Sequence, residues 1–584
     1  MNERWNLESI YNGFDDPAFE QDMAALKEKV AAMTAFAAGL KDAEPIDGLR
    51  RGIALQEELT ELVSKLGEYA SLRQSADSRD RDAGSQMGRI MALYSGVAAS
   101  DAAFQEWAAA LPNLMELVEG DENLQAYRFL FHNMKKSSRY LLGGQGETIM
   151  SKMRLSGGHA WSDMRGYLTS TVPVSYRGET TNLSAIRNLA YDPDPQVRKE
   201  AYEAEIACYD RIKDATAYAL NAIKLETITD CELRGYESPL ARTLEHSDMQ
   251  KATLDAMLGA MDEYLPKFWQ YLKAKAKALG HENGLPWYDL FAPMGASSTK
   301  FTAENAREYL VEQFAGFNPE EADMIRHAFD DEWIDFYPRD GKAGGAFCAY
   351  VECLAQSRIL TNFDGAFGDV VTLAHELGHA YHNLCLEGHR PLNRDYSMPL
   401  AETASTFNEC VVMASAINKA SDDAERIALI ENQLQDATQI ICDIYSRFRF
   451  EAKVFENRKE QFMDADALCD IMLDAQKQCY GDGLDQNCLH PYMWVCKSHY
   501  YGPTFYNFPY AFGGLFARGL YAQYEKEGAA FVPKYKKLLY TTSIATAEDV
   551  AKVAGIDLTD KDFWRSALQM IADQIDLLCD LLEK

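Results

Sequence analysis

The sequence predicts a mainly α-helical protein, and three observations lead to this fold class. Apolar residues recur at three- and four-residue spacing among Glu, Lys, Ala and Gln, the pattern of amphipathic helices. Strand signals are confined to 171–176 and 346–363. No repeat with a period of roughly 20–50 residues, which would indicate a solenoid, stands out. The segments with helical periodicity are 15–40, 50–75, 80–110, 195–230, 247–280, 303–315, 405–420, 424–460 and 562–583.

The chain is long enough for more than one domain. Its 584 residues can form two or more domains, each with an ample core. The sequence Asp192-Pro193-Asp194-Pro195 interrupts the chain just before a strong helical segment. We therefore expect an N-terminal helical region, 1–194, and a second region, 195–584, that carries the chemistry described below.

Composition excludes two classes of partner. The formal net charge is −31, and nucleic-acid binding requires a basic surface. No apolar run approaches the ~20 residues that span a bilayer, so we expect no membrane partner. The opening Met1-Asn2-Glu3-Arg4-Trp5 does not have the pattern of a secretory signal. The twelve cysteines contain no Cys-x-x-Cys pair, which is typical of a reduced compartment, and we expect a cytoplasmic protein.

The pentapeptide His375-Glu376-Leu377-Gly378-His379 indicates a metal site. Its flanks are apolar and contain no proline, so we expect a helix. Positions i and i+4 lie on one helix face, where two imidazoles can share one Zn²⁺ at about 2.0–2.1 Å. Glu376 flanks that face and can take a proton from a zinc-bound water without being a ligand. This is the His-Glu-x-x-His pattern of zinc peptidases.

A third protein ligand completes such a site, and the sequence narrows the choice. The metzincin pattern has Gly and His where this chain has His382 and Cys385, so that class is excluded. A carboxylate from a second helix remains as the alternative. Ser397 followed by Pro399 predicts a helix start, which puts Glu402 in the first or second turn. We predict Glu402 as the third ligand.

Three further carboxylates near the motif have more than one interpretation. Glu387 and Asp395 are rival ligands, although both belong to a turn-rich connection between the two helices. Glu409, seven residues after Glu402, is predicted on the same helix face. There it can hold the imidazole of a metal ligand, or it can simply pair with a lysine or arginine.

An extended stretch, 357–363, precedes the motif and lies between Gly345 and Gly365. We interpret it as part of a small β-sheet beside the zinc helix. If it is an edge strand, it can bind a peptide through backbone hydrogen bonds. A buried structural strand is the alternative, and the sequence does not separate the two.

Two features of the sequence are specific enough to compare with known families: the motif extended to His382, and the segment 401–409. Three further segments, 341–347, 363–365 and 506–510, support the same comparison. In these segments the chain resembles oligoendopeptidase F of the thimet oligopeptidase and neurolysin family of zinc peptidases. Weaker matches at 5–11 and 234–236 extend the resemblance over most of the chain. The resemblance implies His375, His379 and Glu402 as the metal ligands. It also implies two helical lobes around a deep substrate channel.

The same resemblance implies further functional groups on a C-terminal loop that faces the zinc. The matching residues are His499, Tyr506 and Tyr510. Phenol or imidazole donors aimed at a developing oxyanion stabilise the transition state of peptide hydrolysis. The spacing from histidine to tyrosine differs from that of the mammalian members. Gly513 and Gly514 stand where those members carry a further tyrosine.

These features together predict a zinc-dependent endopeptidase with one Zn²⁺ per chain. It would hydrolyse internal bonds of short peptides, with Glu376 as the base. The restriction to short peptides comes from the resemblance alone. The alternatives are a zinc-holding protein without hydrolytic activity, a carboxypeptidase that trims free C-termini, and a helical interaction protein.

Overall fold

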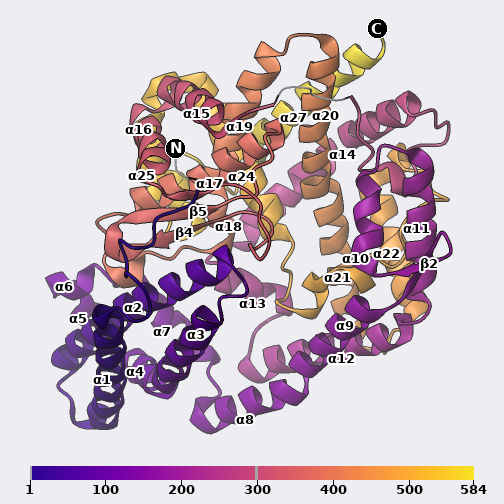
Figure 1. Cartoon of the computed structure of the whole chain (residues 1–584). Coiled ribbons are helices and arrows are strands. Elements are labelled where there is room, and N and C mark those ends of the chain that lie inside the picture. Colours follow the sequence, from indigo (N-terminus) through magenta and orange to yellow (C-terminus); the bar gives the residue numbers. More distant parts are fainter. Residues whose placement is uncertain (1–2, 296–299) are drawn as a thin grey trace. The chain divides into compact units, whose positions relative to one another are not determined.

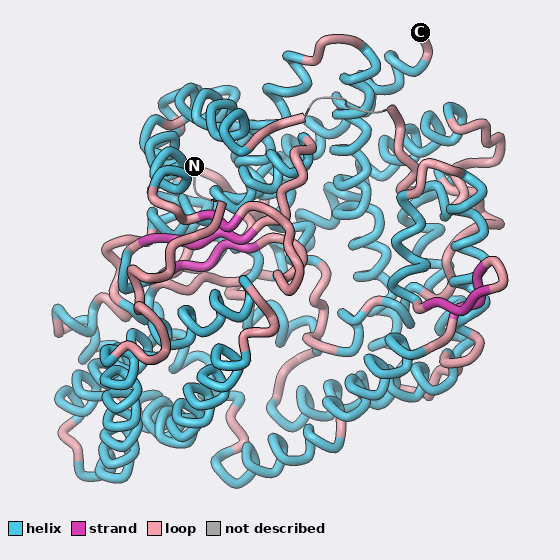
Figure 2. The backbone as a smooth tube through the Cα atoms, viewed as in Figure 1, coloured by secondary structure: helices cyan, strands magenta, loops and turns pink. Residues whose placement is uncertain are grey.

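The computed structural model describes residues 3–295 and 300–584 and is mainly helical, which confirms the predicted fold class (Figure 2). Within these residues, two small sheets accompany the helices. Both regions with strand signals contain strands, whereas the short strand β3 (Ile334–Asp335) was not predicted. In the same ranges no helix is long and apolar enough to cross a membrane.

The chain forms two compact units, and each is assembled from three segments. The first unit comprises the described residues of Met1–Arg139, Thr299–Ser415 and Gln523–Ala554, and the second those of Tyr140–Ser298, Ala416–Ala522 and Gly555–Lys584. The predicted division into 1–194 and 195–584 coincides with neither unit, because the chain enters each unit more than once. That division stays a prediction about where the catalytic region begins.

The first unit has a core in which Leu26, Leu66 and Phe104 are fully buried, and the core extends to Val351 and Leu360 of the sheet. Its helices are α1 (Pro17–Gly39), α2 (Pro45–Ala76), α3 (Arg81–Tyr94), α4 (Ala98–Ala110), α5 (Leu114–Glu119), α6 (Glu122–Gln125), α7 (Arg128–Ser137), α15 (Ala303–Phe317), α16 (Pro319–Asp330), α17 (Phe367–Cys385), α18 (Met398–Ala401), α19 (Thr403–Lys419), α25 (Val532–Thr541) and α26 (Ala547–Val553). Of these, α19 continues past Ser415 into the second unit.

The sheet of the first unit has the strand order β3-β5-β4. Strand β5 (Gln356–Leu360) pairs in parallel with β3 and in antiparallel register with β4 (Phe347–Val351). The stretch at 357–363 therefore contains the central, buried strand, and β4 lies at the edge. Figure 1 shows β4 and β5 alongside α17, and the Asn383 amide of α17 donates to the Ser357 hydroxyl of β5 at 3.4 Å. The sheet beside the motif helix is thus confirmed.

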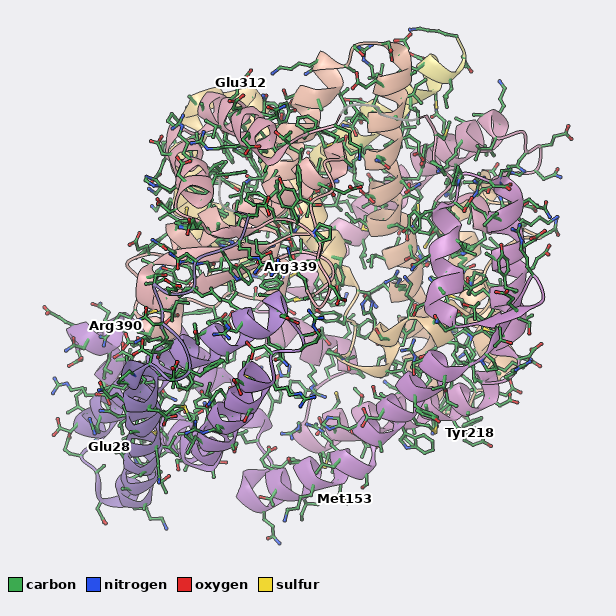
Figure 3. All side chains as sticks on the ribbon, in the orientation of Figure 1. Glu28, Met153, Tyr218, Glu312, Arg339 and Arg390 are labelled. Atoms are coloured by element: carbon green, nitrogen blue, oxygen red, sulfur yellow. The ribbon has the colours of Figure 1, made fainter. Side chains whose placement is uncertain are left out.

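A buried carboxylate fixes the segment that leads into β4. Asp335 of β3 is fully buried and accepts hydrogen bonds from the Arg339 guanidinium at 2.6 and 2.9 Å, and the Lys342 ammonium lies 2.6 Å away (Figure 3 labels Arg339). Gly341 between these cations has φ +88°, and a Cβ there would lie 2.4 Å from the Asp77 carboxylate at the end of α2. Glycine adopts this left-handed conformation without strain and leaves room for the Asp77 carboxylate.

The second unit contains the hairpin of β1 (Val174–Tyr176) and β2 (Glu179–Thr181), and its core includes the fully buried Phe450 and Trp494. Its helices are α8 (Gly143–Ser156), α9 (Gly158–Thr171), α10 (Leu183–Asn188), α11 (Pro195–Tyr209), α12 (Lys213–Arg234), α13 (Pro239–His246), α14 (Lys251–Ala278), α20 (Asp423–Thr438), α21 (Ile444–Arg458), α22 (Ala465–Tyr480), α23 (Met493–Cys496), α24 (Phe508–Glu527) and α27 (Lys561–Leu582). A π-helical turn at Gln439–Asp443 joins α20 to α21. Such turns often accompany functional sites.

A buried polar cluster joins α16, α17 and α19 in the first unit. The Glu321 carboxyl of α16 is fully buried and accepts a hydrogen bond from the Asn408 amide of α19 at 2.8 Å. The same amide donates to the Ala374 carbonyl of α17 at 3.1 Å. Asn318, which caps α16, donates to the Tyr381 hydroxyl of α17 at 2.8 Å. Burial raises the pKa of Glu321 to about 8, against a lowering by Asn408. The carboxyl is therefore protonated at neutral pH.

This shift makes the stability of the fold depend on pH. The folded chain binds the Glu321 proton more tightly than an unfolded chain, in which the pKa is near 4.5. The stabilisation is full below pH 4.5 and declines as the pH rises through 8. Glu321→Gln does not titrate, so its stability relative to the native chain should rise by roughly 2–5 kcal/mol between pH 5 and pH 9. Urea unfolding at a series of pH values measures this difference. The matched control is Glu320→Gln at the exposed neighbouring position, and a Glu321→Gln curve parallel to that of the native chain would contradict the assignment.

Candidate metal centre

Helix α17 presents the two motif histidines on one face. Its N-terminus is fixed by the Asp369 carboxylate, which accepts hydrogen bonds from the backbone N–H groups of Asp364 and Ala366 at 2.8 and 3.0 Å. The rings of His375 and His379 lie one turn apart, with centroids separated by 4.9 Å. Both side chains remain partly exposed, so a metal ion and solvent can reach them.

Glu402 lies at a break between two helices. The short helix α18 starts directly after Ser397 as predicted, but that helix ends at Ala401 and α19 begins at Thr403. Glu402 therefore occupies the junction rather than a helical turn. The Ser405 hydroxyl donates to its carboxylate at 2.7 Å, which fixes the orientation of that carboxylate.

The geometry of the three predicted ligands fits a metal ion. One Glu402 carboxylate oxygen lies 3.3 Å from Nε2 of His375 and 3.4 Å from Nε2 of His379. Two ligands at about 2.0–2.1 Å from a tetrahedral Zn²⁺ are separated by about 3.3–3.4 Å. Among the described residues, these three form the one cluster of His, Cys, Asp or Glu side chains that could hold a metal.

The close approach of α17 to α19 depends on Gly378. A Cβ at this position would lie 2.6 Å from the carbonyl oxygen of Ala404 and from the Cα of Ser405. A larger side chain would push the two helices apart, and with them Glu402 and the imidazoles. This explains why the motif has glycine as its fourth residue in this chain.

Glu409 holds the imidazole of His375. Its carboxylate lies 2.5 Å from His375 Nδ1, the nitrogen on the side of the ring away from Glu402. This contact favours the first of the two predicted roles of Glu409, which is to hold the imidazole of a metal ligand, over pairing with a lysine or arginine. Burial lowers the pKa of His375, but the carboxylates of Glu402 and Glu409 outweigh it and raise the pKa to about 10. With Nδ1–H bonded to Glu409, Nε2 is the atom that would lose its proton when a metal binds.

Glu376 is suited to accept a proton. Its side chain is only 5 % exposed, and burial raises the pKa of its carboxyl above the ordinary value, against a lowering by the neighbouring His375 and His379. A carboxylate whose affinity for a proton is increased by burial is a stronger base.

The rival ligands lie outside the cluster. Glu387 and Asp395 are both exposed. His382 is fully buried, and its Nε2 contacts the Thr542 hydroxyl at 2.8 Å. Its ring also stacks on Tyr396 with centroids 4.2 Å apart, so His382 has a structural role in the packing of α17.

The other predicted site residues belong to the second unit. His499, Tyr506 and Tyr510 come together there, with ring centroids 5.5–5.7 Å apart. His499 lies in a short helical turn at Ser498–Tyr501, and Tyr510 lies in the first turn of α24. We call the segment 499–510 the tyrosine loop.

Burial and a neighbouring arginine together determine the protonation state of His499. The Arg447 guanidinium lies 3.2 Å from His499 Nδ1, and since arginine can only donate, Nδ1 is the acceptor. Burial, followed by Arg447 and Lys497, lowers the pKa of His499 to about 4. The imidazole is therefore neutral at pH 7, and its proton is on Nε2, where it can serve as a hydrogen-bond donor.

Sequence reasoning did not find every residue that shapes these groups. Ser405 could have been suspected, because it follows Glu402 by three residues. Arg447 could not, since it lies 52 residues before His499 in the chain. Asn408 looked like an ordinary helix residue, although it ties α19 to α17.

A helical fold with a His-Glu-x-x-His helix and a carboxylate from a later segment of the chain is the arrangement of a metallopeptidase. The chain belongs to Peptidase family M3, whose model matches residues 188–570. It is 24% identical to "Oligopeptidase PepF" of Bacillus subtilis, over 99% of this chain and 87% of that protein. It is also 24% identical to "Oligoendopeptidase F homolog" of Lactococcus lactis, over 99% of this chain and 97% of that protein.

Solved structures show the same fold. A structure from Chlamydophila abortus matches with a TM-score of 0.87 at 19% identity, covering 99% of this chain and 98% of that chain. Oligoendopeptidase-F from Enterococcus faecium matches with a TM-score of 0.73 at 18% identity, covering 97% and 99%. These matches run over nearly the whole chain, so they cover both units.

The roles of Glu402 and Glu409 can be separated by metal analysis. Glu402→Ala should lose the metal on dialysis, because two imidazoles alone hold it weakly. Glu409→Ala should bind the metal at full stoichiometry but with about 10–100-fold lower affinity, since it removes only the support of an imidazole. Elemental analysis and chelator competition give both values. Normal metal content in dialysed Glu402→Ala would move the third ligand elsewhere.

Proposed function

We propose that the chain is a zinc-dependent endopeptidase that hydrolyses internal bonds of short peptides. The observation that carries this proposal is the cluster of His375, His379 and Glu402, whose spacing matches that of ligands around one Zn²⁺. Membership of Peptidase family M3 supports the reaction, and the names of the relatives support oligopeptides as substrates.

His375, His379 and Glu402 would hold the metal, with Glu409 orienting His375. When bound, Zn²⁺ supplies a Lewis acid that polarises the scissile carbonyl and lowers the pKa of water to about 7. With only three protein ligands, the metal would remain accessible to water and substrate. Neutral imidazoles and an ionised carboxylate are the donor set that catalytic zinc prefers.

Glu376 acts as the base and then as the acid. Its carboxylate removes a proton from the attacking water and delivers it to the leaving amine. Burial supports both steps, because a raised pKa makes the carboxylate a better acceptor while the carboxylic acid can still release the proton. Glu376 is not needed as a ligand, since Glu402 supplies the carboxylate.

The tyrosine loop would stabilise the oxyanion. Tyr506 and Tyr510 offer phenolic O–H groups, and His499 offers an Nε2–H that Arg447 keeps in the donor tautomer. Donors directed at the developing negative charge lower the barrier by about 3–4 kcal/mol each.

The edge strand would bind the substrate backbone. In the described part of the chain β4 pairs with β5 alone, so its other edge can form backbone hydrogen bonds with an extended peptide. Recognition through the backbone gives broad tolerance of side chains, which suits a peptidase acting on varied short peptides.

Glu376→Gln tests the chemical role of the base. The amide keeps the size of the side chain but cannot accept the proton, so turnover should fall by about 10²–10⁴-fold while the metal content stays unchanged. A fluorogenic peptide assay combined with elemental analysis measures both quantities. A metal-loaded Glu376→Gln enzyme with native turnover would exclude Glu376 as the base.

The substrate class is tested with peptides of defined length and ends. A C-terminally amidated fluorogenic nonapeptide should be cut at an internal bond as fast as the free acid, and a chelator should abolish the cleavage until Zn²⁺ is restored. Cleavage that requires a free C-terminus would indicate a carboxypeptidase, and no chelator-sensitive cleavage at all would indicate a zinc-holding protein. Intact casein degraded as fast as the nonapeptide would contradict the restriction to short substrates.

A further inference from the structure

The tyrosine loop contains a strained residue next to Tyr506. Phe505 has φ +52°, the left-handed region that bulky residues rarely adopt. Such conformations persist only where the surrounding structure holds them, and they cluster at functional sites. Contacts to both the backbone and the side chain of Phe505 hold it in this conformation.

A buried carboxylate on α21 binds the backbone at this turn. Glu451 is 1% exposed and accepts hydrogen bonds from the Phe505 N–H at 3.2 Å and from the Asn507 amide at 2.8 Å. The Lys224 ammonium of α12 donates to the same carboxylate at 2.6 Å, and it is also 1% exposed. The negative charge of Glu451 is therefore paired inside the protein rather than by solvent.

The Phe505 side chain is fixed as well. It is 2% exposed and packs between Phe448 and Phe455, with ring centroids 5.3 and 5.5 Å away. Both rings come from α21, the helix that carries Glu451. Backbone and side chain of the strained residue are thus held by one helix.

The turn at Phe505 determines the start of α24. The Asn507 N–H donates to the Phe505 carbonyl at 2.7 Å, which spans Tyr506. The Tyr510 N–H then donates to the Asn507 carbonyl at 3.1 Å. Asn507 itself is fully buried and bonded to Glu451. The position at which Asn507 is held therefore determines the positions of Tyr506 and Tyr510.

One face of α21 contacts both parts of the loop. Arg447 and Glu451 are four residues apart and lie on the same face. Arg447 contacts His499 at the start of the loop, and Glu451 holds the turn at Phe505 in its middle. Asp443, the last residue of the π-helical turn, pairs with Arg447 and so ties this face to the preceding turn.

We propose that Glu451 is a positioning residue for the tyrosine loop. Its carboxylate holds the left-handed turn at Phe505 and so fixes where the phenols of Tyr506 and Tyr510 project. Lys224 pairs with that carboxylate and holds it in place. This inference rests on the proposed function, in which these phenols act on the oxyanion.

Glu451→Gln is the first test. It keeps the shape but turns one acceptor into a donor that faces Lys224 or Asn507. We expect kcat on the fluorogenic nonapeptide to fall by about 10–100-fold, because misplacement of about 1 Å has that effect, while KM changes by less than about threefold. Metal content should stay at one per chain.

The matched control is Glu431→Gln. Glu431 forms the same kind of buried pair with Lys275 in the second unit, and it also accepts from the Tyr271 hydroxyl. This variant should lower the melting temperature about as much as Glu451→Gln but leave kcat unchanged. An equal loss of kcat in both variants would mean that loss of stability, and not loop position, is responsible, and would overturn the proposal.

A double-mutant cycle separates positioning from a general effect. Tyr506→Phe should lower kcat by at least about tenfold in the native background but by less than about threefold in the Glu451→Gln background, because the phenol is already misplaced there. Fully multiplicative effects would show that Glu451 does not act through the loop. If Glu451→Gln does not fold, the double variant Lys224→Met/Glu451→Met replaces the whole ion pair by apolar residues, a change that proteins often tolerate. The same loss of kcat is expected in this variant.

Hydrogen exchange tests the inference independently of activity. Amide exchange in 504–508 should be at least about tenfold faster in Glu451→Gln than in Glu431→Gln. If the native chain cleaves no peptide, the proposed function fails, yet faster exchange would still establish the anchoring role. Unchanged exchange together with unchanged kcat would overturn the inference while leaving the peptidase assignment intact.

Discussion

The metal centre depends on the contact between two helices at Gly378. One helix can present two imidazoles by its own periodicity, but the third donor comes from another part of the chain. The absence of a side chain at Gly378 lets the backbone of α19 approach, and Glu402 then lies 3.3 and 3.4 Å from the two imidazole nitrogens. The Asn408 amide holds the same two helices together through the Ala374 carbonyl, next to His375. The donor geometry is therefore a property of backbone packing.

Buried carboxylates hold the backbone or neighbouring helices at three places in this structure. The cost of burying each carboxylate is offset in a different way. Asp335 is paired with an arginine and a lysine, Glu451 is paired with one lysine and also accepts backbone and amide donors, and burial keeps Glu321 protonated. A charge of −31 suggests only a solvated acidic surface. The structure shows that a few of those carboxylates organise the interior, next to the edge strand, the metal helix and the tyrosine loop.

The sequence predicted the helical fold class, the sheet beside α17 and the pairing of His375 with His379, because helical periodicity and the motif spacing are local signals. Glu402 was predicted from the helix start after Ser397 and from the family resemblance, and it joins the two histidines although it lies between two helices. It could not predict that β5 is the central strand, since strand order depends on partners distant in the chain. The left-handed turn at Phe505 was equally hidden, because phenylalanine favours no such conformation and Glu451 lies 54 residues away. Residues that act through tertiary contacts produce no sequence pattern at a fixed spacing, so the sequence alone does not identify them.

The most direct test of the central claim is X-ray absorption spectroscopy of the full chain loaded with one equivalent of Zn²⁺. The account predicts a first shell of nitrogen and oxygen at about 2.0–2.1 Å, with the multiple-scattering signature of two imidazoles and no sulfur. Glu402→Ala should hold the metal so weakly that dialysis removes it and the spectrum is lost. A sulfur shell at about 2.3 Å, or a native nitrogen and oxygen shell that persists in dialysed Glu402→Ala, would show that the metal is bound by other residues and would contradict the account.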